Sequence, residues 1–423
     1  MPLSIPTTNA DAVTPTPGMF RALRHRNYRL FWAGALLSNT GTWMQALAQG
    51  YLVYELTRSP WWLGVDGFMA TAPGLVLTLV GGVFADWFDR RRLLLLTQIG
   101  AGLSALALAG LAYNGAIKVW MILALSFVTG CCMSLAGPSF HAIALDLVGR
   151  EDLPNAIALN SAQFQFSRVM GPSLAGIALR SLGVAACFFA NSLSFVAVVI
   201  GLLLVRLPAT GPVQSAAKAK NLSTVWQDLR AGFAYVRRRP RVTLLLLVSA
   251  VNSFFGAPYL SQVPHFARDI LLAGESGLSL LMAASGAGAF CGALMLAFLG
   301  NFRRKGWAVL VCSFVFGLGV VMFALSQQLM LSLLALLLMG MSGVGAFAMT
   351  NMMIQQLVTD EMRGRVMSML ILTFVGSLPF SNLLAGAAAT RFGAPHTLAV
   401  GGFLIMIFTV FVTLFSKRLR ESD

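Results

Sequence analysis

The stretch Gly81-Gly82-Val83-Phe84-Ala85-Asp86-Trp87-Phe88-Asp89-Arg90-Arg91-Arg92 lies between two long apolar runs. An acidic residue ends the first run, and three arginines open the second. Runs of about 20 apolar residues are long enough to cross a bilayer as helices. Arginines beside such runs mark the side of the membrane that faces the cytoplasm. The stretch therefore predicts a membrane protein that crosses the bilayer repeatedly, with these arginines on the cytoplasmic side.

The composition indicates that lipid surrounds most of the chain. Its 423 residues are 57% hydrophobic and 11% charged, whereas about a quarter of the residues in a soluble domain are charged. The net charge of +15 is explained by basic residues that flank membrane spans. Because these basic residues form no patches interleaved with aromatic residues outside the apolar runs, we expect no nucleic-acid partner.

Twelve apolar runs are long enough to span a bilayer, where an open sheet would leave its edges unpaired, so we expect an all-α membrane protein. Of the 30 Lys and Arg residues, 24 lie on one side of these runs. This bias places both termini in the cytoplasm and predicts a multi-pass protein of the cell (inner) membrane. The expected spans are residues 30–54, 62–86, 93–113, 118–146, 156–179, 184–206, 242–266, 276–299, 306–326, 330–357, 366–390 and 396–416.

A long polar insert divides the spans six and six. The expected order is a cytoplasmic tail, a six-helix half, a linker with a surface helix, a second six-helix half and a short tail, at residues 1–29, 30–207, 208–241, 242–416 and 417–423. A weak internal repeat matches this division and relates, for example, Gly82 to Gly292. Two halves related by a pseudo-two-fold axis are a known transporter layout, with the substrate site where the halves meet.

The opening stretch also carries a spaced motif. The pattern Gly82-xxx-Asp86-xxx-Arg90-Arg91 resembles the signature that the major facilitator superfamily has between its second and third helices. Three other stretches resemble the drug:proton antiporters of the enterobactin-exporter and macrolide-efflux type, at residues 26–32 (RNYRLFW), 151–160 (EDLPNAIALN) and 363–368 (RGRVMS). The resemblance implies the major facilitator fold and the function of an exporter.

The motif departs from the family pattern in two ways. Trp87 stands where the family usually has arginine, and Asp89 stands where it often has glycine. In the second half, Gly292 is followed by no aspartate, and only the basic block at residues 303–305 remains. The motif of the first half is therefore expected to carry most of any gating role.

The motif predicts a contact between the halves at the cytoplasmic side. Asp86 ends the second helix, and the eleventh helix is expected to begin near Val366, where its N-terminus carries partial positive charge. Gly82, one turn before Asp86, would allow the helices to approach closely. The resemblance implies that Asp86 is a latch for the inner gate. The alternative is an ordinary interface charge.

The resemblance also gives the latch charged partners. Arg90, Arg91 and Asp146 match residues that belong to the gating motif and its charge relay in the family. They are therefore expected to act together with Asp86.

The fifth helix contains a second motif. Gly171, Pro172 and Gly176 resemble the exporter signature of the superfamily, and such residues permit a kink and close packing. The alternative is a generic packing kink. Arg168 lies nearby, close to the middle of the membrane, where a charge is costly and is expected to face the central cavity. It either recognises an anionic substrate or pairs with polar groups of neighbouring helices.

Asp66 is the first candidate for proton coupling, because it is the acidic residue expected within a helix rather than at a helix end. It precedes Asp86 by 20 residues, which is about 30 Å along a helix, so it is expected in the outer part of the membrane. The alternative is an aspartate at a helix end in contact with water. His141 in the fourth helix is a second candidate.

Neutral amides are scattered over the remaining helices and predict the lining of a substrate cavity: Asn39, Gln45, Gln49, Gln163 and Asn252. An apolar cavity with a few polar groups suits an amphipathic compound. We therefore expect an alternating-access exporter of a small amphipathic molecule, such as a drug or siderophore, with protons as coupling ion. The alternative is a lipid or lysolipid flippase, or an uncoupled facilitator, on the same fold.

The sequence also indicates what the protein lacks. It contains no metal-ligand cluster, no pairing of a nucleophile with a base, and no phosphate-binding loop. We therefore expect no enzyme activity, no metal and no cofactor. The resemblance implies a monomer in the lipid bilayer.

Overall fold

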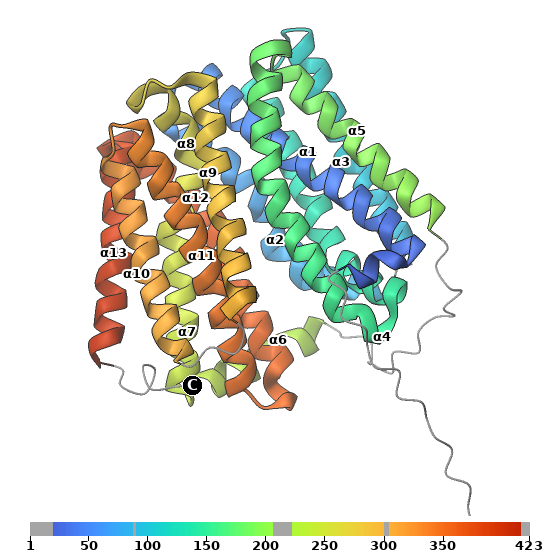
Figure 1. The fold of residues 1–423 in the computed structure, drawn as a ribbon, viewed down its shortest axis with the longest axis vertical. Coiled ribbons are helices and arrows are strands. Elements are labelled where there is room, and N and C mark those ends of the chain that lie inside the picture. The colour runs from blue at the N-terminus through green and yellow to red at the C-terminus, as the bar shows by residue number, and fades with distance from the viewer. Residues whose placement is uncertain (1–19, 88–89, 206–221, 300–303, 416–423) are drawn as a thin grey trace, which may run out of the picture.

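The computed structural model describes residues 20–87, 90–205, 222–299 and 304–415. Within these ranges, a set of side chains stays undescribed, at residues 78–87, 90, 138, 141, 142, 144, 145, 150, 222–226, 228, 229 and 299. The described chain is helical and contains no strand. Its long helices form two groups that lie side by side (Figure 1).

The N-terminal group consists of η1 (Arg21–Arg24), α1 (Arg26–Thr57), α2 (Pro60–Trp87), α3 (Arg90–Tyr113), α4 (Val119–Leu182) and α5 (Val184–Leu204). The helix α6 (Leu222–Arg237) follows. The C-terminal group consists of α7 (Pro240–Val251), η2 (Asn252–Gly256), α8 (Tyr259–His265), η3 (Phe266–Ile270), α9 (Gly274–Leu299), α10 (Lys305–Leu325), α11 (Leu329–Leu357), α12 (Asp360–Phe392) and α13 (Ala394–Phe415).

To count membrane crossings, one of these helices must be divided into two, and four consecutive elements must be joined into one. The helix α4 turns at Gly149, whose φ of 74° is not helical, so α4 consists of two arms at residues 119–148 and 150–182. Glycine adopts this conformation readily because it has no Cβ. Conversely, α7, η2, α8 and η3 together make one span, Pro240–Ile270. The two π-helical turns η2 and η3 widen this span locally without ending it.

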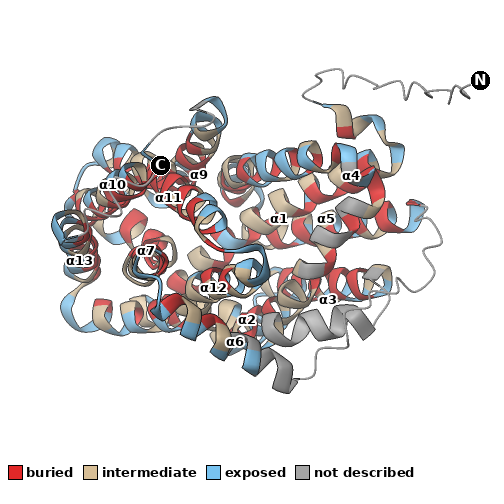
Figure 2. Ribbon diagram, turned by 90° about the horizontal axis from the view of Figure 1, so that it is seen from below, coloured by how far each residue is buried: buried red, intermediate tan, exposed pale blue. Residues whose placement is uncertain are grey.

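Divided in this way, the described chain has six long helices in each half, which confirms the predicted fold of twelve transmembrane helices. Nine of the described helices are long and apolar enough to cross a membrane by length and composition alone. Many large apolar side chains on the outer surface are exposed, for example Phe298 with 88% and Leu182 with 73%. Figure 2 shows buried residues on the inner sides of the helices and exposed residues on the outside.

The helices alternate in direction, so the bundle has two ends. We call the end with residues 26, 204, 240, 360 and 415 the terminal face, and the end with the turns at 57–60, 113–119, 182–184, 270–274, 325–329 and 392–394 the opposite face.

Two helices begin six residues earlier at the terminal face than the apolar pattern predicts. The eleventh crossing, α12, begins at Asp360 instead of Val366, and the second arm of α4 begins at residue 150 instead of 156. The first turn of α12 holds Asp360 and Glu361, whose charge suits a helix N-terminus. Hydropathy locates the part of a helix that lies in lipid, whereas polar residues extend the helix beyond it.

The short helix η1 packs on the second arm of α4 at the terminal face. Arg21 pairs with the buried Asp152 through Nε and Oδ1 at 2.6 Å, and His25 Nε2 lies 2.7 Å from the other oxygen of the same carboxylate. The Ala22 amide donates to Asn155 Oδ1 at 2.9 Å. Residues directly before α1 are therefore folded against the body of the N-terminal half.

Glycines bring the two halves together at two helix pairs, α2 with α12 and α4 with α9. On α2, a Cβ added to Gly64 would lie 2.5 Å from the Asn382 carbonyl oxygen and 2.9 Å from the Gly386 Cα of α12. On α9, a Cβ added to Gly286 would lie 2.4 Å from the Arg168 carbonyl oxygen. Helices packed this closely in a membrane gain dispersion contacts that a larger residue would exclude.

A leucine at position 64 tests this contact. Gly64→Leu should separate α2 from α12, because its side chain meets backbone atoms that cannot rotate away. Overpacking of this kind costs about 1–3 kcal/mol, so we expect a melting temperature several degrees lower in detergent and loss of transport. The control is Gly110→Leu, because an added Cβ at Gly110 meets no atom within 4 Å. Equal melting temperatures for the two variants would contradict the prediction.

Candidate functional site

Asp66 lies inside the N-terminal half, held by side chains from two other helices. Gln49 Nε2 of α1 donates to both carboxylate oxygens, at 2.9 and 3.0 Å. Ser126 Oγ of α4 donates to Oδ1 at 2.6 Å and lies 2.7 Å from the same Gln49 amide. Asp66 is half-buried, whereas Gln49 and Ser126 are buried. All these partners are neutral, so the carboxyl group is held by dipoles and no charge is paired with it in these bonds.

The hydrogen bonds continue from Gln49 towards α5. Gln45 Nε2 lies 3.5 Å from Gln49 Oε1, and Asn191 Nδ2 of α5 donates to Gln45 Oε1 at 2.7 Å. Ser194 Oγ donates to Asn191 Oδ1 at 3.0 Å. A polar network thus joins α1, α2, α4 and α5 within one half. Buried amides of this kind need partners, since an unpaired polar group in a dry interior costs about 1–3 kcal/mol.

Arg168 lies about halfway along the second arm of α4. Its guanidinium group stacks over the Trp43 ring at 5.2 Å, and Nη1 lies 3.5 Å from Gln165 Oε1. Trp43 also meets Phe164 edge to face, with 6.2 Å between ring centroids. Gln165 in turn lies 3.5 Å, through Nε2, from the Ala289 carbonyl of α9 in the other half. The cation is therefore held by an aromatic face next to the junction of the two halves.

The exporter motif occupies both contact surfaces of this arm. A Cβ added to Gly171 would lie 2.5 Å from Trp43 Cβ, so this glycine permits α4 to pack on α1. A Cβ added to Gly176 would lie 2.5 Å from Ser279 Cβ of α9. The Ser279 hydroxyl donates to the Pro172 carbonyl at 2.8 Å across the halves. Pro172 leaves the carbonyl four residues before it without its helical donor.

A group of polar residues joins the halves near the opposite face. We call it the cross-half cluster; it consists of Tyr51, Tyr54 and Glu55 on α1 and His265, Arg268, Asp269 and Glu275 on α8, η3 and α9. At its centre, the Tyr54 hydroxyl donates to Asp269 and lies 2.6 Å from His265 Nδ1. His265 Nδ1 and Asp269 Oδ2 are 3.5 Å apart.

Two further contacts flank this centre. Glu55 pairs with Arg268 of the other half, and Arg58 Nη2 lies 3.2 Å from the same glutamate. Tyr51 donates to Glu275 Oε1 at 2.8 Å. Because Tyr54 and Glu55 follow Tyr51 by three and four positions, both lie next to it on one face of α1. One turn of α1 is thus bound to the C-terminal half by three separate contacts.

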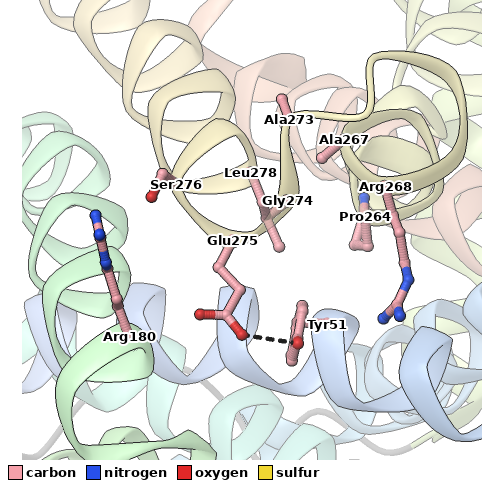
Figure 3. A pocket seen from close by; sticks show the side chains of 10 residues that line it. All are labelled: Tyr51, Arg180, Pro264, Ala267, Arg268, Ala273, Gly274, Glu275, Ser276 and Leu278. Atoms are coloured by element: carbon pink, nitrogen blue, oxygen red, sulfur yellow. Dashed lines mark hydrogen bonds between the residues drawn. The ribbon is translucent and has the colours of Figure 1, made fainter.

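A pocket with a volume of about 460 Å³ lies beside Tyr51 and Glu275. It opens between the halves and is lined from both of them (Figure 3). Arg180 of α4 and Arg268 of η3 lie on either side of the Tyr51–Glu275 hydrogen bond in this view. The pocket belongs to the same cross-half surface and adds charged groups to its rim.

The predicted gating motif falls largely outside the described residues. The side chains of Gly82, Asp86 and Arg90 are not described, so the contact of Asp86 with the start of α12 stays a prediction. Arg91 is described, and its Nη2 donates to the Leu203 carbonyl near the end of α5 at 2.9 Å.

Two other predicted residues lie on the first arm of α4. Asp146 is half-buried near its end at the terminal face, and the side chain of His141 lies outside the described residues.

The remaining predicted cavity residues are spread over both halves. Asn39 is half-buried on α1, and Gln163 is buried on α4 with no hydrogen-bond partner for Nε2. Asn252 lies in η2 and donates to Ser313 Oγ of α10 at 2.8 Å. Within the described residues, no group of three or more His, Cys, Asp or Glu side chains is placed to hold a metal ion.

Sequence reasoning did not single out Ser126 or the cross-half cluster. A lone serine in an apolar helix has no distinctive signal, because such serines commonly bond their own helix. The cross-half cluster does have a sequence signal. Tyr51, Tyr54 and Glu55 share a helical face. The same spacing recurs near the end of the seventh crossing, in His265, Arg268 and Asp269.

Two helical halves, with glycine contacts and the cross-half cluster at their interface, have the architecture of a secondary transporter of the major facilitator fold. The sequence profile of the transmembrane secretion effector family matches residues 17–423. The chain therefore belongs to this family of the major facilitator superfamily and is a multi-pass integral membrane protein.

Characterised relatives cover nearly the whole chain. Macrolide efflux protein A of Streptococcus pyogenes is 21% identical over 407 residues, which are 95% of this chain and 99% of the relative. The staphyloferrin A transporter of Staphylococcus aureus is 22% identical, over 93% of this chain and 97% of its own length. The enterobactin exporter EntS of Shigella boydii is 25% identical, over 94% and 93%. These relatives are transporters.

Solved structures show the same fold at lower sequence identity. The D-xylose-proton symporter superposes with a TM-score of 0.74 at 11% identity and covers 95% of this chain and all of its own. A bacterial homologue of the human lysosomal transporter Spinster, inward-facing and unoccupied, has a TM-score of 0.68 at 14% identity, over 93% and 95%. At these identities the likeness extends to the fold alone.

Exchange of the charges of Glu55 and Arg268 tests the cross-half cluster. Glu55→Arg alone places like charges together and should lower the melting temperature by a few degrees, because a partly exposed pair contributes up to about 1 kcal/mol and repulsion replaces it. Adding Arg268→Glu restores opposite charges and should recover at least half of the loss. A double variant as unstable as the sum of the single variants would show that the two side chains do not interact.

Proposed function

We propose that this protein is an alternating-access exporter of a small amphipathic molecule, driven by protons that Asp66 takes up and releases. The buried polar network around Asp66 carries the proposal. Asp66 is six residues from the start of α2, about 9 Å along the helix, and lies among buried polar side chains of α1 and α4. A carboxyl group so placed is costly to ionise unless dipoles or water compensate, so its charge depends on how the surrounding helices are arranged.

Export as the direction of transport is supported by the family and by the relatives. The relatives named for macrolide efflux and enterobactin export match more than nine-tenths of this chain. The motif of Gly171, Pro172 and Gly176 packs α4 on both α1 and α9, where the halves must move against each other. We propose macrolide-like or siderophore-like compounds as the substrate class.

Arg168 and Trp43 are the proposed contacts for substrate. The guanidinium group stacked on the indole ring offers a positive charge and an aromatic edge to an anionic or aromatic group of the substrate. The remaining proposed contacts are the amides of Asn39, Gln163 and Asn252. The protein acts as a monomer in the bilayer, and it performs transport without enzymatic chemistry.

The proposed orientation places the terminal face in the cytoplasm of the cell (inner) membrane, because most of the Lys and Arg residues flank this face. The cross-half cluster then closes the outer side. The Asp86 latch at the start of α12, with Arg90, Arg91 and Asp146, is the proposed inner gate, and His141 is a second proposed proton site.

Substitution of Asp66 by asparagine tests proton coupling. Asp66→Asn keeps the shape and the hydrogen bonds of a neutral carboxyl group but cannot titrate. In liposomes loaded with a radiolabelled macrolide or with enterobactin, the variant should lose transport driven by a pH gradient while exchange of labelled for unlabelled substrate continues. Gradient-driven transport equal to the wild-type rate would contradict the role of Asp66.

The same experiment on the wild-type chain separates the proposal from its alternative. A proton-coupled exporter accelerates transport when a pH gradient is imposed. An uncoupled facilitator or a lipid flippase moves its substrate, here tested with a labelled lysolipid, at a rate that the gradient does not change. That result would replace the proposed function by the alternative.

The proposed contact between Arg168 and the substrate is tested by comparing an anionic with a cationic compound. Arg168→Gln should weaken binding of a catecholate siderophore about tenfold or more, because a hydrogen bond to a charged group contributes about 1.5–3 kcal/mol. Binding of a cationic macrolide should change little. Substrate-dependent thermal shift measures both. An equal loss for both compounds would show that Arg168 holds the helices rather than the substrate.

A further inference from the structure

The segment of α1 from Gln49 to Glu55 contacts two separate places. At its start, Gln49 holds both oxygens of Asp66 on α2. At its end, Tyr54 and Glu55 hold the C-terminal half through Asp269 and Arg268. Six residues of helix are about 9 Å long, so the two sets of contacts are joined by less than two turns of one rigid element.

We infer that Gln49 is a positioning residue that links the proton occupancy of Asp66 to the opening of the opposite face. While Asp66 is ionised, the Gln49 amide donates to both of its oxygens and holds α1 in the position in which the cross-half cluster forms. A protonated Asp66 offers one good acceptor instead of two, so its hydrogen bonding to Gln49 weakens and α1 is free to move. The inference rests on the proposed role of Asp66 as the proton site.

Antiport gives a physical reason for such a link. An exporter that exchanges protons for substrate must not change sides while it carries neither, because that step would let the gradient dissipate. An ionised Asp66 held by Gln49 locks α1 and, through Tyr54 and Glu55, keeps the opposite face closed in the empty state. Proton uptake removes the lock and allows the change of sides.

The described groups that surround Asp66 are neutral, so none of them would itself make the opening of the opposite face depend on pH. In the described structure, α1 presents Gln49 to Asp66, α4 presents Ser126, and α12 packs against the neighbouring Gly67 through Asn382, and all three are neutral. Gln262 of α8 reaches α2 only at the Pro60 carbonyl, at 3.4 Å.

Tyr113, Lys118, Arg391 and His396 are charged or titratable groups of the opposite face that lie at the ends of α3, α4, α12 and α13. Further such groups lie in the cross-half cluster and next to it. On α1 these are Tyr51, Tyr54, Glu55 and Arg58; on α8, η3 and α9 they are His265, Arg268, Asp269 and Glu275; on α4 it is Arg180. His265 therefore needs its own control, because its proton would also alter the cluster.

The test measures opening directly and needs no substrate. Spin labels are attached to Leu182→Cys and Met330→Cys, which are exposed near the opposite face in the N-terminal and C-terminal halves, in a chain whose five native cysteines are replaced by alanine. Pulsed electron paramagnetic resonance then gives the ratio of open to closed protein in lipid nanodiscs between pH 8 and pH 5. For the wild-type sequence we expect this ratio to be low at pH 8 and to rise several-fold at pH 5.

Gln49→Leu should raise the ratio at pH 8 about tenfold, because hydrogen bonds to a charged group are lost, and should abolish its dependence on pH. Gln49→Asn, which is one methylene shorter and remains polar, should behave in the same way and serves if the leucine variant does not fold. The matched control is Gln355→Leu at the other end of the bundle, where, among the described residues, the amide donates to Asn351 of its own helix at 2.6 Å. It should leave the pH response unchanged.

Two further variants distinguish control of opening by Asp66 from a general weakening of the contacts of α1. Tyr54→Phe removes only the hydroxyl of the cross-half cluster, so it should raise the ratio at every pH and keep the pH response. His265→Gln should keep the response as well, because its source is Asp66. Loss of the response in His265→Gln would overturn the inference, since the titrating group would then lie in the cluster.

The outcomes also separate this inference from the proposed function. A wild-type ratio that does not change with pH would mean that no proton site controls the opposite face, and both would fail. A wild-type response that Asp66→Asn abolishes but Gln49→Leu leaves intact would keep Asp66 as the proton site and overturn the role of Gln49 alone.

Discussion

A polar side chain inside a helix bundle in lipid has no bulk water to pair with, so it must find partners on neighbouring helices. The bonds from Gln49 and Ser126 to Asp66 follow from this constraint, and they join three helices of the N-terminal half at one carboxyl group. The hydrogen bond between Gln45 and Asn191 extends this network to a fourth helix, α5. Side chains of α1 and α4 thus meet at the same carboxyl group of α2.

Contacts between the halves obey a different physical rule. Glycines at α2–α12 and α4–α9 allow backbones to meet at distances that exclude side chains, and this packing has no charge. Near the opposite face, by contrast, hydrogen bonds and an ion pair connect α1 to η3 and α9. Such contacts can be exchanged for water when the face opens, whereas packed glycines can slide without breaking a bond. The two kinds of contact together suit a pair of halves that rock against each other.

The predicted spans agree with the observed helices to within a few residues in their apolar parts, because hydropathy reports burial in lipid directly. The largest differences lie at the terminal face, where α12 begins at Asp360 and the second arm of α4 at residue 150. Charged residues there continue a helix out of the apolar layer. The stacking of Arg168 on Trp43 involves a partner 125 residues away, which the spacing along one helix does not indicate.

The sequence by itself determined that this is a multi-pass membrane protein, the number and place of its crossings, and Asp66 as an acid within a helix, since each depends on local composition and spacing. Only the tertiary structure decided which neutral groups hold that acid and which charges join the halves. Ser126 and Gln49 lie 60 and 17 residues from Asp66, and Glu55 lies more than 200 residues from Arg268. Pairings at such separations arise from the way the helices pack. The periodicity of one helix does not indicate which other helices pack against it.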